Sequence, residues 1–325
     1  MRFLTLRIAV IVPVLVGASM FSFGLVHMAP GDPVNVLLGP YASEDDRATM
    51  RSALALDQPI PVQYGRWLGR TVTGDLGMSI QLRTPVRDVL FERFANTLRL
   101  GVPSFLLALV VGLAAGALAA LRTDGILDRT LQVLVVFGGT MPIFWLGLIL
   151  VWIFSLELGW FPAAGMGPIG RDPTLFETAR HLVLPVLTTA AIPAAIIARA
   201  SRSAVREVLD EDFVWAAKGR GVRAPGLLAR HIIKPVLPMV IHQVGLQFAY
   251  MIGGTIVFAE VVFNWPGIGL QTIHAVSSRD FPMIQGVVLL AALATVIINL
   301  AVDAIHRYVD PRAGLGREST VEAWR

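Results

Sequence analysis

The residue types that could carry out chemistry are present in this sequence, but their spacing forms no catalytic pattern. A phosphate-binding loop has glycine directly before its lysine, so that the lysine and backbone N–H groups hold the phosphates. The two lysines, Lys218 and Lys234, follow Ala217 and Ile233 instead. No two of the six histidines are four residues apart, which excludes a His-Glu-x-x-His zinc helix. We therefore expect no enzyme activity and no metal or cofactor site in this chain itself.

The composition is that of a membrane protein. Of 325 residues, 55% are hydrophobic and 15% are charged, whereas soluble domains carry about 25% charged residues. With no cysteine, the chain has neither a disulfide framework nor a thiolate metal site. The net charge of +4 and the pI of about 9.9 raise the question of nucleic acid. Because the basic residues flank apolar segments, we assign them to cytoplasmic loops and expect no nucleic acid partner.

Six apolar runs are long enough to form helices that cross a membrane, which takes about 20 residues. They cover residues 8–28, 98–121, 131–156, 182–198, 238–258 and 284–305. The first run resembles a signal peptide, but it exceeds the usual apolar stretch of about 7–15 residues and lacks a small-x-small cleavage site, so we expect an uncleaved span. Pro185 and Pro193 interrupt the fourth run and favour a helix packed inside a bundle. The sequence thus predicts an all-α membrane protein with about six transmembrane helices.

The distribution of arginine and lysine predicts which loops face the cytoplasm. Residues 199–234 carry eight basic side chains, whereas residues 157–180 carry two and residues 259–283 carry one. We therefore place the loop 199–237 on the cytoplasmic side and the other two loops outside. With six spans, both the N- and the C-terminus are then cytoplasmic.

Between the first two spans lies a polar segment, residues 29–97, which this orientation places outside the cytoplasm. Ser43 is followed by three acidic residues, which predicts a helix that begins there and runs to about residue 56. A second helix is expected over residues 62–73. Pro85 is typical of a first helical residue, and its helix leads into the second span. Contact with a solute-delivering partner and simple scaffold packing are equal alternatives for this segment.

Four polar residues in the first half of the fifth span are candidates for lining a translocation path: His242, Gln243, Gln247 and Tyr250. Polar groups buried in a membrane need partners, so hydrogen bonds between helices explain them equally well. The spans otherwise contain almost no ionisable residues, which ion-gradient-driven transporters usually hold deep in the membrane. A secondary transporter is therefore the weaker alternative to a protein driven by a partner's ATP.

The loop between the fourth and fifth spans has the most informative pattern. It contains Glu211-Asp212-Phe213, then the pair Ala216-Ala217, Gly221 four residues on, and Leu237-Pro238 at its end. Acids favour a helix N-terminus, small residues allow close docking, and Gly221 permits a positive φ where the chain turns back. Anionic lipid is an alternative partner for so basic a loop. The acids and the glycine-bounded alanine pair favour docking onto a protein.

This pattern resembles the cytoplasmic "EAA" loop of ABC-importer permeases, in which a turn joins two short helices. Trp215 stands where the eponymous glutamate would be, so no ion pair is carried over there. Further motifs across residues 2–312 resemble the B-type inner-membrane permease of the dipeptide, oligopeptide and nickel importers, which are binding-protein-dependent transport systems. These motifs are Ala29-Pro-Gly-Asp-Pro33, Leu56-Asp-Gln-Pro-Ile-Pro-Val-Gln-Tyr64, Gly74-Asp-Leu-Gly-Met-Ser79, Glu260-Val-Val-Phe-Asn-Trp-Pro-Gly-Ile-Gly269 and Arg279-Asp-Phe-Pro282.

The resemblance implies a type I ABC-importer permease fold in the bacterial plasma (inner) membrane. It implies an N-terminal transmembrane helix (1–28), an extracytoplasmic segment (29–97), a core of five transmembrane helices (98–312) that contains the coupling loop 199–237, and a tail (313–325). The implied partners are a second homologous permease that forms a heterodimer, ABC ATPase subunits that bind ATP and Mg, an extracytoplasmic substrate-binding protein or lipoprotein, and membrane lipid.

The resemblance also implies the function, which is half of the translocation path of an ATP-driven importer for di- or oligopeptides. Nickel chelates, glutathione and opines are alternative cargoes, and a membrane-embedded enzyme is a rival that lacks a visible nucleophile or metal site. In coupling, Phe213 and the alanine face would dock onto the ATPase while Gly221 fixes the turn. The implied coupling residues are Glu211, Asp212, Phe213, Ala216, Ala217, Gly221, His231 and Pro238. The candidate outer-gate residues, with a plain connector as the alternative, are Glu260, Asn264, Trp265, Pro266 and Gly267.

Overall fold

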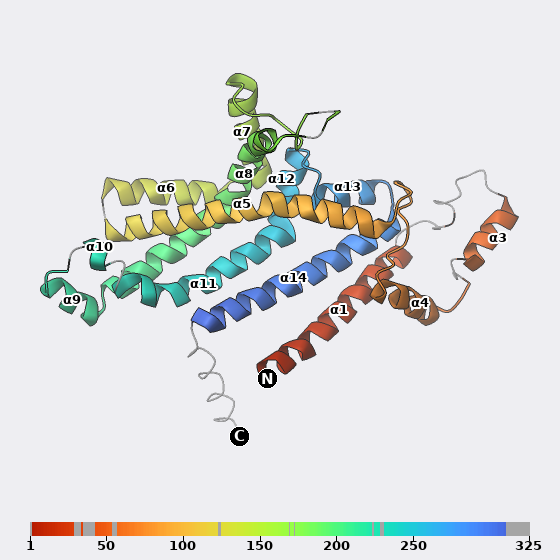
Figure 1. The fold of residues 1–325 in the computed structure, drawn as a ribbon, viewed down its shortest axis with the longest axis horizontal. Coiled ribbons are helices and arrows are strands. Elements are labelled where there is room, and N and C mark those ends of the chain that lie inside the picture. Colours follow the sequence, from red (N-terminus) through yellow and green to blue (C-terminus); the bar gives the residue numbers. More distant parts are fainter. Residues whose placement is uncertain are drawn as a thin grey trace. The chain divides into compact units, whose positions relative to one another are not determined.

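The computed structural model describes residues 2–28, 34, 43–53, 57–122, 125–168, 170–171, 173–222, 224–227 and 231–309. All regular elements in these ranges are helices, apart from an isolated antiparallel bridge between Met78 and Pro85 (Figure 1). The motif at 29–33, residue 56 of the second motif and the predicted tail 313–325 lie outside the described residues. The described part of the chain is all-α, as the sequence predicts.

The described residues pack into two compact units. The first unit consists of Met1–Asn96 and Gly267–Val296, and the second of Thr97–Pro266 and Ile297–Arg325. Two long helices, α5 (Val86–Leu121) and α14 (Phe281–Val309), contribute residues to both units. The domain boundaries expected at residues 28, 97 and 312 stay predictions.

Five helical runs among the described residues are long and apolar enough to cross a membrane. They are α1 (Arg2–Met28), α5, α8 (Leu175–Leu209), the run from α11 (Ile233–Tyr250) through the π-helical turn η3 (Met251–Thr255) into α12 (Ile256–Val262), and α14. The fourth span is an unbroken helix, α8, in which Pro185 and Pro193 are both buried. This burial agrees with the predicted position inside a bundle. The helix expected from residue 85 is the first part of α5 rather than a separate element.

The predicted third span is not one straight helix. It consists of α6 (Ile126–Thr140), followed by α7 (Ile143–Leu150) and its π-helical extension η1 (Val151–Glu157), and its two parts are bent by 108°. Met141 adopts an extended backbone with ψ of 132°, because the ring of Pro142 disfavours a helical conformation in the preceding residue. Counting the bent pair as one span gives six spans for the described chain.

The two short helices between α1 and α5 begin close to their predicted positions. α3 (Glu44–Ala53) is capped by Ser43, whose hydroxyl accepts a hydrogen bond from the backbone N–H of Asp46 at 3.1 Å. α4 (Ile60–Val72) is followed by a turn in which Gly74 and Gly77 have φ of 88° and 81°. Glycine adopts this left-handed conformation without a steric cost, which explains its presence at both positions.

A buried carboxylate joins two of the sequence motifs in the first unit. Asp280 is 1% exposed and accepts hydrogen bonds from Ser79 Oγ and from the backbone N–H groups of Ile80 (3.2 Å), Gln81 (3.3 Å) and Met283 (3.3 Å). It therefore caps the N-terminus of α14 and also holds the turn that precedes α5. The motifs at 74–79 and 279–282 are far apart in the sequence and meet in this network.

Close helix packing organises the second unit, in which α6 and α11 both lie against α8 (Figure 1). A Cβ added at Gly112 of α5 would lie 2.8 Å from Ile197 Cβ, and one added at Gly116 would lie 2.4 Å from Ala198 O. The Gly-x-x-x-Gly spacing thus lets α5 approach the backbone of α8 directly, as small residues do between membrane helices.

Candidate functional site

The loop between α8 and α11 forms a short helix closed by a glycine. This helix, α9 (Asp212–Gly219), follows Glu211 as its N-cap residue. Gly221 has a φ of 80° and donates its N–H to Lys218 O at 2.9 Å, and the next N–H donates to Ala217 O at 3.2 Å. These two hydrogen bonds form a Schellman motif, which needs a left-handed residue after the helix. The predicted positive φ at Gly221 is confirmed.

One face of α9 belongs to the chain's own core. Val214 is 0% exposed and Ala217 is 1% exposed, and both pack with Val205 and Val208 of α8 and Val236 of α11. Ala217 therefore has no surface left for another protein. The expectation that both alanines form a docking face is therefore wrong for Ala217. Successive helical residues point about 100° apart, so Ala216 is exposed although Ala217 is buried.

The exposed side of α9 carries aromatic side chains. Phe213 is 42% exposed and Trp215 is 62% exposed, and Ala216 also lies at the surface. Lys218 Nζ lies 4.9 Å from the centroid of the Trp215 ring, a cation–π geometry. Exposed aromatic side chains on a short loop helix make this surface a candidate for binding another protein. Trp215, which stands at the position of the glutamate in the EAA pattern, is thus part of the candidate docking surface.

Two other predicted coupling residues lie around the start of α11. His231 is half-buried in the short π-helical turn before the helix, and Pro238 is the sixth residue inside it. The fifth span therefore begins at Ile233, five residues before the start that the sequence indicates. Ile232 and Val240 are buried in the core that also holds α9. α8, α9 and α11 thus form one packed junction.

A buried ion pair that the sequence analysis did not identify ties α8 to α6. Arg202 binds both carboxylate oxygens of Asp128, with Nε–Oδ1 at 2.9 Å and Nη2–Oδ2 at 2.8 Å. Asp128 is 1% exposed and also accepts a hydrogen bond from Gln132 Nε2 at 2.9 Å. Bidentate charge-assisted pairs are strong and directional. The pair therefore holds α6 in register with α8, two turns before the junction with α9.

The four candidate path residues of α11 do not share one face. Gln243, Gln247 and Tyr250 follow the i, i+4, i+7 spacing of one helix side, whereas His242 is rotated from Gln243 by about 100°. Gln247 is 6% exposed and Tyr250 is 69% exposed, so this side passes from the core to the surface along the helix. Directly after Tyr250 the helix widens into η3, and π-helical segments are frequent at functional sites.

Two of the candidate outer-gate residues are core residues of the second unit. Glu260 is fully buried and accepts a hydrogen bond from Thr97 Oγ1 at 2.6 Å. Its backbone carbonyl accepts the N–H of Trp265 at 2.8 Å, and Trp265 is likewise fully buried. In the state that the structure describes, these two residues anchor the turn after α12 from the inside.

The other three candidate gate residues are spread over the remainder of that turn. Asn264 is exposed and has a φ of 46°, a left-handed conformation that asparagine tolerates better than most residues. Pro266 is half-buried and is the last residue of the first of the two stretches that make up the second unit. Gly267 belongs to the first unit, where it is the N-cap residue of α13 (Ile268–Ser277).

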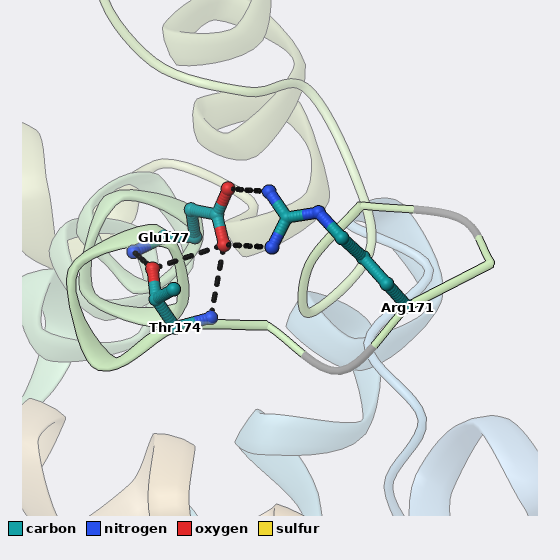
Figure 2. Close-up of polar contacts among 3 residues, drawn as sticks. All are labelled: Arg171, Thr174 and Glu177. Atoms are coloured by element: carbon teal, nitrogen blue, oxygen red, sulfur yellow. Dashed lines mark hydrogen bonds and ion pairs between the residues drawn. The ribbon is translucent and has the colours of Figure 1, made fainter.

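A capping box closes the N-terminus of α8, as Figure 2 shows. Thr174 Oγ1 accepts Glu177 N at 3.3 Å, and Glu177 Oε2 accepts Thr174 N at 2.9 Å. Arg171 donates through Nη1 to Oε2 at 3.0 Å and through Nη2 to Oε1. Glu177 precedes the apolar run at 182–198, which is the part of α8 that the sequence predicts to cross the membrane. The Arg171 guanidinium, followed by the Thr174 hydrogen bonds, lowers the pKa of Glu177 from 4.5 to about 2.

Comparison with known families accounts for nearly the whole chain. Residues 112–314 match the family described as the binding-protein-dependent transport system inner membrane component, and residues 1–101 match the N-terminal part of such a membrane component. The chain belongs to this family.

Two relatives match the permease along almost its full length. The dipeptide transport system permease protein DppB of Alkalihalophilus pseudofirmus is 35% identical, and the match covers 94% of this chain and 97% of that protein. The glutathione transport system permease protein GsiC of Escherichia coli K12 is 37% identical, with 94% and 96% covered. The permease is therefore a multi-pass inner-membrane subunit of an ABC importer, and its family is one of transporters.

Solved structures show the same fold. A chain of the MetNI methionine ABC transporter in an inward-facing conformation gives a TM-score of 0.56 at 18% identity, covering 68% of this chain and 96% of that chain. A chain of an amino acid ABC transporter gives a TM-score of 0.52 at 14% identity, covering 68% and 94%. The type I ABC-importer permease fold that the sequence predicts is confirmed.

Proposed function

We propose that the permease forms half of the translocation path of an ATP-driven importer for short peptides. One observation carries the cargo class: relatives at 35% and 37% identity over 94% of the chain are named as dipeptide and glutathione permeases. Glutathione is itself a tripeptide, so both names fall within one chemical class. A second homologous permease would supply the other half of the path, and an extracytoplasmic binding protein would deliver the peptide.

In this proposal the work comes from partner ATPase subunits that bind ATP and Mg, since the chain has no phosphate-binding loop. We assign the exposed side of α9 to these subunits, because Phe213, Trp215 and Ala216 stand clear of the chain's own core. The opposite side of α9 packs on α8 and α11. A displacement of α9 is therefore passed directly to two membrane-crossing helices. This assignment places α9 in the cytoplasm.

The side of α11 that carries Gln243, Gln247 and Tyr250 is the part of the path that we assign to this chain. Amide and hydroxyl groups can hydrogen-bond both the N–H and the C=O groups of a peptide backbone, which suits a path that carries many side chains. Glu260 and Trp265 then act as the fixed base of the turn after α12, and Asn264 is the exposed residue that a gate at this turn would move.

Reconstitution in liposomes tests the proposal. The permease is combined with its second permease, the ATPase subunits and the binding protein, and uptake of dipeptides, tripeptides, longer peptides, glutathione and nickel chelates is measured. We expect uptake of short peptides that requires ATP hydrolysis and persists in the presence of an ionophore. Uptake by this chain alone that an ionophore abolishes would show a secondary transporter instead. If nickel chelates are taken up and none of the peptides is, the assignment of short peptides as the cargo is refuted.

A further inference from the structure

α4 lies alongside the C-terminal half of α1 and does not stand beyond the end of that helix (Figure 1). The hydroxyls of Tyr64 and Ser19 are 2.7 Å apart, and His27 Nε2 and Gln63 Oε1 are 3.2 Å apart. The centroids of the Phe23 and Tyr64 rings are 5.4 Å apart. These contacts belong to the first unit, and the α1 residues that make them extend over two turns of the helix.

Ser19 lies deep within the membrane-crossing part of α1. The apolar window of α1 is Ile11–Met28, and Ser19 is nine residues from its end (28 minus 19), which is about 13 Å along a helix. A hydrocarbon core is about 30 Å thick, so Ser19 is near its middle. The Tyr64 side chain is shorter than 13 Å, and much of its length crosses the gap between the two helices. The α4 backbone at Tyr64 is therefore level with the hydrocarbon region.

The exposed residues of α4 combine apolar and cationic side chains. Ile60, Val62 and Val72 are exposed by 59%, 41% and 78%, and Arg66 and Arg70 are exposed four residues apart. The sequence of α4 contains no acidic residue. Apolar side chains together with arginines and aromatic rings are typical of a helix that lies in a membrane interface.

We propose that α4 is an interfacial helix seated in the lipid at the Met28 end of α1, and that Arg66 and Arg70 bind the phosphates of anionic phospholipids. A guanidinium binds phosphate through two parallel hydrogen bonds. The long arginine side chain lets a partly inserted helix reach the headgroups. The exposed Ile60, Val62 and Val72 then contact acyl chains instead of water. α4 is thus a lipid anchor for the segment between α1 and α5.

The absence of cysteine from the sequence allows a direct test of depth by spin labelling. Gly65 and Gly69 of α4 both have open space where a Cβ would be added, so G65C and G69C can carry a label without a clash. In the assembled importer in nanodiscs, collisions with oxygen, which concentrates in lipid, are compared with collisions with a water-soluble nickel chelate. The matched control is S52C on the exposed surface of the polar helix α3.

We expect the labels on α4 to favour oxygen and the label on α3 to favour the nickel chelate. Preferential access of the nickel chelate at both α4 positions would place the helix in water and overturn the proposal. Low access of both reagents at both positions would assign the face to a covering protein, and it would overturn the proposal as well.

A second measurement tests the arginines. The double variant R66Q/R70Q is compared with R47Q/R51Q, which removes two charges at the same spacing from α3. Native mass spectrometry of the importer reports the phosphatidylglycerol that each variant retains against phosphatidylcholine. We expect R66Q/R70Q to retain phosphatidylglycerol about tenfold less well, since each basic residue near a membrane surface contributes measurably to the attraction. Added inorganic phosphate should not displace the lipid. Equal retention by the two double variants would overturn the assignment of the headgroup site.

Discussion

Asp128 illustrates how a single buried charge can fix the relation between two helices. Asp128 is 1% exposed, and its two carboxylate oxygens accept hydrogen bonds from Nε and Nη2 of Arg202. An ion pair of this kind adds little stability compared with apolar packing, but the loss of one partner leaves an uncompensated buried charge. Its role is therefore to hold α6 and α8 in one geometry, next to the helix that we assign to the ATPase.

Replacement of one partner should reveal this constraint. Arg202→Met should destabilise the permease by about 3–5 kcal/mol, because it strands the Asp128 carboxylate in the core. Arg206→Met, at an exposed site one turn further on the same helix, should change stability by no more than about 0.5 kcal/mol. Thermal unfolding in detergent measures both. The double variant Asp128→Leu/Arg202→Met should recover part of the lost stability. Equal melting temperatures for Arg202→Met and Arg206→Met would show that the ion pair does not constrain the two helices.

Glu177 supplies a prediction about pH. Its pKa is about 2 in the folded chain and 4.5 in the reference state, so the ionised carboxylate stabilises the fold. This contribution is complete above about pH 4.5 and is lost as the pH falls from 4.5 towards 2. Glu177→Gln should therefore have a lower melting temperature than the wild type at pH 7. The difference between the two melting temperatures should become smaller as the pH falls from 4.5 towards 2. In an Arg171→Met background, Glu177→Gln should lower the melting temperature by a smaller amount already at pH 7. A melting-temperature difference between Glu177→Gln and the wild type that stays constant from pH 6 to pH 3 would refute the lowered pKa of Glu177.

At the scale of elements, the turn after α9 offers a matched pair of glycines. Gly219 and Gly221 both have open space where a Cβ would be added, but only Gly221 has a positive φ. A β-branched residue at Gly221 must adopt a left-handed conformation, which costs at least about 1–2 kcal/mol. Gly221→Val should therefore leave membrane insertion intact while peptide import and substrate-stimulated ATPase activity both fall. Gly219→Val should retain both activities, and unchanged import by Gly221→Val would reject the coupling role of this turn.

The elements differ in how far the sequence could predict them. Gly221 is a local signal, because the residue type alone reports the backbone conformation it permits. The bend between α6 and α7 also has a local cause in Pro142, but the continuous apolar run around it hides the break. Gly112 and Gly116 have the spacing of a helix-packing motif, so their contact with α8 was available from the sequence and was missed. The burial of Ala217 depends on α11 and could not be predicted locally.

At the scale of the whole molecule, the hydrocarbon core explains why the all-α fold and the approximate number of spans could be predicted. Each crossing helix must satisfy its own backbone and match the membrane thickness, which leaves a long apolar run in the sequence. The sequence contains no comparable signal that shows which residues bind a buried polar group. Asp280 meets Ser79 across 201 residues, and Glu260 meets Thr97 across 163 residues. The quoted motifs mark Asp280 and Glu260, but only the packed fold shows what each one binds.

The length of α8 has a consequence for how work crosses the membrane. Its 35 residues, Leu175–Leu209, form one helix that follows the capping box at Thr174 and is separated from α9 by Asp210 and Glu211. It is a rod about 52 Å long. Pivoting such a rod by about 6° swings its far tip by about 5 Å. In the proposed coupling, a small tilt that the ATPase subunits impose at the α9 end of α8 would become a displacement comparable to the width of a peptide backbone at the other end of the helix.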